Sequence, residues 1–159
     1  MKILKVKDVG DDYHRETSTF DIPFKVLVNG KSQASGKTTV VLNLLLNPDF
    51  GFDKLFEGEN IYIVSDNKLD NKLQTLADYK EIPDENIMSY DENVLTELYS
   101  ELEDKFLEEK EENNIQNRVI LFDDCGYSGN LKNKQSGIIS KLICNGRHLK
   151  NKSIRGDSL

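Results

Sequence analysis

The sequence has few cysteines and no long hydrophobic run. Its two cysteines, Cys125 and Cys144, are not closely spaced, which is typical of neither a disulfide framework nor a metal site and favours a reducing compartment. No stretch approaches the roughly 20 apolar residues that a membrane span needs, and the opening residues lack the apolar core of a signal peptide. We therefore expect a cytoplasmic protein with no membrane span, and neither a membrane protein nor a secreted one.

The sequence also has no excess of basic residues. The chain has 21 Lys and Arg residues against 28 Asp and Glu residues, a net charge of −7. Any contact with DNA or RNA must therefore come from a local basic patch or from an assembly, because the overall charge repels a polyanion. With 159 residues, of which 37% are hydrophobic, the chain is expected to form a single globular domain over residues 1–159.

The alternation of apolar patterns predicts an α/β fold. Compact apolar runs at 24–28 and 60–65 are typical of strands, the first of them buried, and the most hydrophobic run, 118–124, is typical of a fully buried parallel strand. Further strands are expected at 3–6 and 87–90, and helices at 38–46, about 69–79, 92–112 and 135–144. This order predicts a three-layer fold with a mostly parallel sheet.

A glycine-containing loop joins the predicted strand 24–28 to the predicted helix 38–46. It has the sequence GKSQASGKT, from Gly30 to Thr38. Backbone N–H groups of such a loop and of the first helical turn converge on phosphate oxygens, and the helix dipole assists them. In the pattern G-x-x-x-x-G-K-[ST], the lysine reaches the β- and γ-phosphates and the hydroxyl residue ligates Mg²⁺. The predicted contacts with ATP are Gly30, Ser35, Gly36, Lys37, Thr38 and Thr39, with Lys37 also catalytic and Thr38 also a metal ligand.

One position departs from this phosphate-loop pattern. Lys31 stands where the first glycine is expected, and Gly30 comes one residue early. Either the loop carries one extra residue, or Lys31 takes the place of that glycine at some conformational cost. The alternative is a chance S-G-K-T before a helix, which the strand–loop–helix context and a second motif disfavour.

The second motif is a pair of acids at the end of the apolar run VILFDD. The run delivers Asp123 and Asp124 to the carboxyl edge of the predicted sheet, where open α/β sheets bind their ligands. Asp123 is expected to hold Mg²⁺ through water, and Asp124 is expected to act as the catalytic base that polarises the attacking water. The alternative is that the two acids simply end the strand and cap the following loop.

Together these segments resemble the poxvirus-type genome-packaging ATPases of the FtsK–HerA superfamily of P-loop ATPases. The resemblance covers about residues 24–154 and is carried by the segments GKSQASGKTTVVLNLLLN, VILFDDCG and GRHLKNKSI. It implies an ATP-hydrolysing, homo-oligomeric ring that moves double-stranded DNA into a capsid, with capsid proteins as partners and the host cytoplasm or virion as location. The local lysines expected to contact DNA are Lys132, Lys134, Lys141, Lys150 and Lys152.

Two features beyond the acidic run bear on this resemblance. Ring ATPases commonly complete each site with an arginine from a neighbouring subunit, and Arg147 is the catalytic candidate for that role; the alternative is a helix-end arginine stabilised by the dipole.

The resemblance also implies a later strand, which lies between 24–28 and the acidic strand in the sheet and contacts the γ-phosphate. Only residues 152–154 begin to match it. The chain is therefore expected to be the N-terminal part of the core of a longer ATPase, incomplete at its C-terminus.

Two other functions share the phosphate loop. A P-loop kinase of nucleotides or small molecules would normally show an arginine-rich lid, and the chain has only four arginines, Arg15, Arg118, Arg147 and Arg155. A nucleotide-binding regulatory or scaffold protein without turnover is compatible with the irregular glycine position.

Overall fold

The computed structural model describes residues 24–29, 36–65, 69–123, 125, 137–138 and 141–142, and in this part of the chain it shows a mixed α/β fold. The strands are β1 (Ile61–Ser65), β2 (Ile87–Met88) and β3 (Val119–Asp123). The helices are α1 (Lys37–Leu46), α2 (Asn71–Lys80) and α3 (Glu92–Glu111), with short 3-10 helices η2 (Pro48–Phe50), η3 (Gly58–Asn60) and η4 (Asp84–Asn86). The three strands are parallel, in the order β2-β1-β3.

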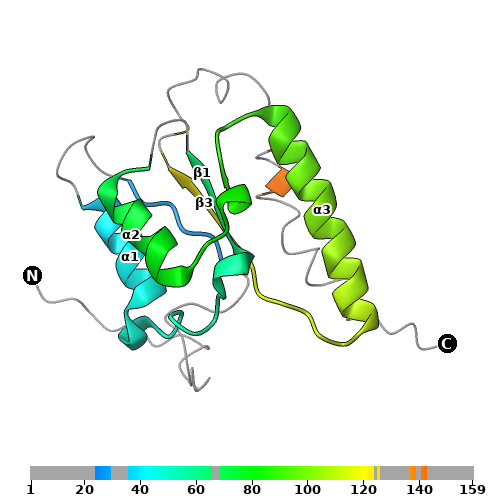
Figure 1. Cartoon of the computed structure of the whole chain (residues 1–159), viewed down its shortest axis with the longest axis horizontal. Helices are drawn as coiled ribbons and strands as arrows, with labels where there is room; N and C mark the ends of the chain where they lie inside the picture. Colours follow the sequence, from blue (N-terminus) through cyan, green and yellow to red (C-terminus); the bar gives the residue numbers. More distant parts are fainter. Residues whose placement is uncertain are drawn as a thin grey trace, which may run out of the picture.

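The sheet separates two hydrophobic clusters. Side chains of β1 alternate between its faces: Ile61 and Ile63 join the cluster that contains residues of α1 and α2, and Tyr62 and Val64 join the cluster that contains residues of α3. Figure 1 shows the same layers, with α1 and α2 together on one side of the sheet and α3 on the other. All five residues of β1 are buried, as expected for a central parallel strand.

The helices form where their apolar residues recur on one face. In α3, the residues Leu95, Leu98, Leu102 and Phe106 are buried at helical spacing. The helices predicted at 38–46, 69–79 and 92–112 and the strands at 60–65 and 87–90 are confirmed within one or two residues at most ends. Among the described residues, no helix is both long enough and apolar enough to cross a membrane.

The prediction of a buried strand at 24–28 is wrong. These residues form no strand, Leu27 is 92% exposed and Val26 is 45% exposed. The first residue of the run packs against the core: the ring centroid of Phe24 lies 4.9 Å from that of Phe52 and 6.5 Å from that of Phe56. Apolar, β-branched residues form a strand only when a neighbouring strand accepts their backbone hydrogen bonds, and no described strand pairs with this segment.

The acidic run forms the parallel strand β3 as predicted, but it is not fully buried. Four of its five residues are half-buried, and the fifth, Phe122, is 38% exposed. In the described part of the chain, β3 pairs with β1 on one edge and with no strand on the other. One unpaired edge explains why a near-continuous apolar run remains partly accessible.

Several expected elements lie outside the described residues. They are the strand at 3–6, most of the helix at 135–144, and the segment 152–154. From the expected helix 135–144, the described residues Ile138 and Leu142 are buried in the cluster on the α3 face.

A close backbone approach fixes the start of η3. A Cβ atom on Gly58 would lie 1.9 Å from the carbonyl oxygen of Lys80 and 2.9 Å from that of Glu81, so only glycine fits. The Lys80 ammonium group also donates hydrogen bonds to the carbonyl oxygens of Asp53 and Phe56. The end of α2 is thereby held against the chain that leads into β1.

We therefore predict that Gly58→Ala lowers the free energy of unfolding by about 2 kcal/mol, because the added methyl group must displace backbone atoms. Chemical denaturation measures the change. As a control, Glu57→Ala alters an exposed neighbour whose side chain caps no N–H group, and its effect should stay within about 0.5 kcal/mol. Equal stability of Gly58→Ala and wild type would contradict this close packing.

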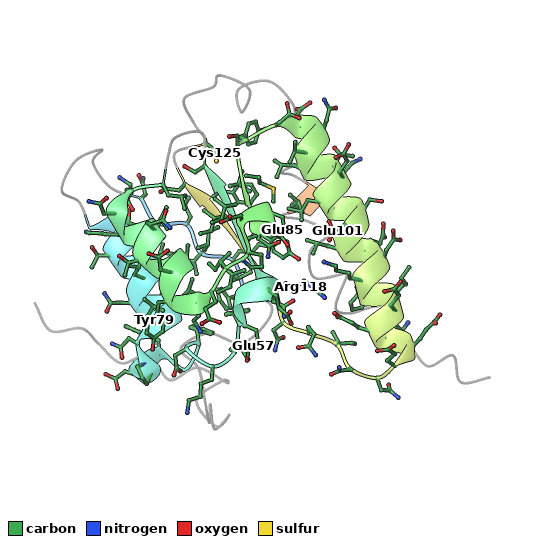
Figure 2. All side chains as sticks on the ribbon, viewed as in Figure 1. Glu57, Tyr79, Glu85, Glu101, Arg118 and Cys125 are labelled. Atoms are coloured by element: carbon green, nitrogen blue, oxygen red, sulfur yellow. The ribbon has the colours of Figure 1, made fainter. Side chains whose placement is uncertain are left out.

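An ion pair links the end of α3 to the chain entering β3. Both nitrogens of the Arg118 fork donate to the Glu109 carboxylate, one at 2.9 Å, and the Gln116 N–H donates to the same carboxylate at 3.0 Å. Burial by itself raises the pKa of Glu109, but the hydrogen bonds from Arg118 and Gln116 and the positive charge of Arg118 outweigh it and lower the pKa below the ordinary 4.5. Figure 2 shows Arg118 near the opposite end of the sheet from Cys125.

A carboxylate whose pKa is lowered by folding stabilises the protein above its unfolded pKa, and this contribution is lost as the pH falls through the folded pKa. We predict that Glu109→Gln costs about 2 kcal/mol of unfolding free energy at pH 7. The difference from wild type should persist down to about pH 5 and vanish below the folded pKa of Glu109. Urea denaturation from pH 7 to pH 3 tests this, with the exposed neighbour change Glu108→Gln as control. A difference independent of pH would rule out the charged pair as its cause.

Candidate functional site

The carboxyl ends of the strands and the N-termini of the helices meet at one edge of the sheet. The strands are parallel, so β1 and β3 both end at this edge. Figure 1 shows α1, α2 and α3 beginning there and running back along the sheet. Helix N-termini carry partial positive charge, and ligands of open α/β sheets bind at this edge.

The first turn of α1 comes directly after the predicted phosphate loop. Gly36 is the N-cap residue, with φ 74° in the left-handed region that favours glycine. Lys37 begins the helix, and the Val40 N–H donates to the Gly36 carbonyl oxygen at 2.9 Å. No side chain caps this helix, and no acidic residue lies in its first turn. The described residues Gly36 to Thr39 therefore form a left-handed turn residue followed by the first turn of a helix.

The other two α-helices at this edge have acidic N-cap residues. The Asp70 carboxylate accepts hydrogen bonds from the N–H groups of Lys72 and Leu73 at the start of α2. The Asp91 carboxylate does the same for two N–H groups at the start of α3. Among the described α-helices, α1 is thus the one whose N-terminus carries no acidic cap, and an anion can approach it without repulsion from such a cap.

Asp123 belongs to the same edge and to the same face of the sheet as α1. It is the last residue of β3 and pairs in register with Ser65, the last residue of β1. Because side chains alternate along a strand, Asp123 shares its face with Val119 and Leu121, which pack against the cluster that includes α1 residues. The structure thus brings the predicted metal acid to the face covered by the helix that begins with Lys37 and Thr38.

Thr39 has a partner on the neighbouring helix. The Lys72 ammonium group donates to the Thr39 hydroxyl at 2.7 Å, and both side chains are exposed. This hydrogen bond joins the first turns of α1 and α2 and adds a second lysine beside the predicted phosphate loop.

The residues at this edge are compatible with a magnesium ion. A carboxylate from Asp123 and hydroxyls from Thr38 and Ser65 are oxygen donors, which Mg²⁺ prefers, and it usually keeps several waters and takes phosphate oxygens. In the described segments, no group of three or more His, Cys, Asp or Glu side chains is gathered to hold a metal ion. The donors therefore fit an ion shared with a phosphate ligand better than one in an all-protein cage.

Cys125 lies just beyond β3 on the opposite face. Its sulfur is buried and lies 3.3 Å from the carbonyl oxygens of Val64 and Asp123. Its neighbours are residues of the cluster on the α3 face, so Cys125 packs there as a small buried residue.

Other predicted site residues lie outside the described part of the chain. They are Gly30, Ser35, Asp124, Arg147 and the lysines Lys132, Lys134, Lys150 and Lys152. Of the lysines expected to contact DNA, Lys141 is described, and its side chain is exposed.

Two residues of this edge were missed by the sequence analysis, Ser65 and Lys72. A polar residue closing the apolar run IYIVS was the signal available for Ser65. For Lys72, the sequence holds no comparable signal, because its partner is 33 positions away.

No protein-family model, curated protein or solved structure matches the chain.

Proposed function

We propose that this protein is a P-loop ATPase domain that binds ATP at the N-terminus of α1 and hydrolyses it with Mg²⁺. The observation that carries the proposal is the pairing of a glycine-started helix without an acidic cap, which begins with Lys37 and Thr38, with Asp123 at the same edge and face of the sheet. A site for a nucleoside triphosphate needs both features: N–H groups and a lysine that bind the phosphates, and a carboxylate that binds the accompanying metal.

The residues then have distinct tasks. The N–H groups of the first turn and the Lys37 ammonium group bind the phosphates and offset the charge that develops during transfer. The Thr38 hydroxyl and the Asp123 carboxylate would hold Mg²⁺, which neutralises phosphate charge when bound. Asp124 accepts a proton from the attacking water, as its position in the acidic pair suggests. Arg147 of a neighbouring subunit completes the site in a ring.

We further propose that ATP hydrolysis is coupled to the movement of DNA, and the resemblance to packaging ATPases supports this part. The domain then works in a homo-oligomeric ring that translocates double-stranded DNA, with contacts from local lysines. A phosphate-release assay with and without double-stranded DNA tests it. DNA-stimulated release supports the motor, binding without release supports a regulatory subunit, and transfer to an added acceptor supports a kinase.

Lys37→Ala is predicted to weaken ATP binding at least a hundredfold while leaving thermal stability unchanged, because Lys37 neutralises phosphate charge and lies outside the buried core. Fluorescent-ATP titration and a melting curve measure the two effects. Lys54→Ala is the matched control: it removes the same charge from an exposed position after the far end of α1, a helix about 15 Å long. Unchanged ATP affinity in Lys37→Ala would refute the phosphate site.

Asp124→Asn is predicted to separate binding from hydrolysis. The amide keeps the shape of the carboxylate but cannot accept the proton of water, so the variant should bind Mg²⁺ and ATP normally while kcat falls about a hundredfold or more. Single-turnover phosphate release, run beside an ATP-binding titration, measures both. Turnover at the wild-type rate in this variant would show that another residue is the catalytic base.

A further inference from the structure

Ser65 is a buried polar residue at the same edge as Asp123. The residue is 6% exposed, although it closes a strand of which the other four residues are apolar or aromatic. A buried hydroxyl is costly unless it is hydrogen-bonded, so a polar residue here calls for a polar neighbour. An apolar residue would complete the strand equally well if only packing mattered.

The strand register places Asp123 beside Ser65. Ser65 and Asp123 are paired residues on adjacent parallel strands, whose backbones lie about 4.8 Å apart. By the alternation of side chains, Ser65 shares its face with Ile61 and Ile63, and Asp123 shares the same face with Val119 and Leu121. The two side chains therefore project side by side, toward the face on which α1 begins with Lys37.

We propose that Ser65 is a positioning residue of the magnesium site, an inference that rests on the proposed ATPase function. Its hydroxyl donates a hydrogen bond to the Asp123 carboxylate, or to a water that the carboxylate holds, and so fixes the carboxylate in the orientation that the ion requires. Groups that orient a metal-binding carboxylate affect metal affinity by about 10- to 100-fold when they are removed.

The position of Ser65 suits this role better than the role of a direct phosphate ligand. Ser65 is the last residue of the central strand β1, so β3 and Asp123 lie between it and any group bound along the edge of β3 that no described strand pairs with. Phosphates, in the proposed function, bind at the first turn of α1. The hydroxyl of Ser65 is thus best placed to act through Asp123.

The test is the magnesium dependence of nucleotide binding, measured with a fluorescent, non-hydrolysable ATP analogue while Mg²⁺ is titrated. Ser65→Ala should raise the Mg²⁺ concentration for half-maximal binding about tenfold. Binding of the analogue in EDTA should not change, because the phosphate contacts of α1 remain. Ser65→Thr, which keeps the hydroxyl, should retain the wild-type magnesium dependence.

Ser89→Ala is the matched control. Ser89 follows β2 at the same edge, is exposed, and is separated from β3 by the central strand, so its substitution should leave the magnesium dependence unchanged. Melting curves check that each variant is folded. A Ser65→Ala protein within twofold of wild type, or an equal shift in Ser65→Ala and Ser65→Thr, would overturn the role of the hydroxyl. A wild-type protein that binds no nucleotide would instead refute the ATPase proposal itself.

Discussion

The parallel pairing of β1 with β3 is the constraint on which the rest of this structure depends. It joins two segments more than fifty residues apart in register from Ile61 and Val119 to Ser65 and Asp123. Because the strands are parallel, this one register sets which edge receives the polar strand ends. Because side chains alternate, it also sets which face they share with α1. A shift of one residue would turn Asp123 to the face of α3.

Helix capping divides the helices at this edge into two kinds. Asp70 and Asp91 satisfy the first N–H groups of α2 and α3, and a cap of this type is worth about 1 kcal/mol. The N-cap of α1 is Gly36, which has no side chain to contribute. If an anion binds there, as we propose, it takes the place that a carboxylate fills in the other two helices, and the stability of the first turn of α1 becomes linked to the ligand.

Much of this fold could be predicted from the sequence because its periodic patterns are strong. Leu95, Leu98 and Leu102 recur at helical spacing, and β1 is a short apolar run of typical length. The run 24–28 has the same local character as β1, yet it forms no strand, since strand formation depends on a partner that local sequence does not specify. The burial of β3 was overestimated for the same reason.

The candidate site shows the same division. Lys37, Thr38 and Asp123 could be predicted because short motifs place them at the ends of elements. Ser65 also closes an apolar run, but the sequence does not specify its register with Asp123, from which its significance comes. Contacts such as the fit of Gly58 against Lys80 and the pair of Arg118 with Glu109 likewise depend on three-dimensional approach alone.

The central claim is that phosphates bind where α1 begins, at the edge formed by the ends of β1 and β3. The most direct test is an amide NMR titration of the 18.2 kDa protein with ATP and Mg²⁺. We predict that the largest shifts occur at Gly36, Lys37 and Thr38, with smaller shifts at Ser65 and Asp123 and none near Arg118 at the opposite end. Shifts absent from the first turn of α1, or centred near Arg118, would contradict it.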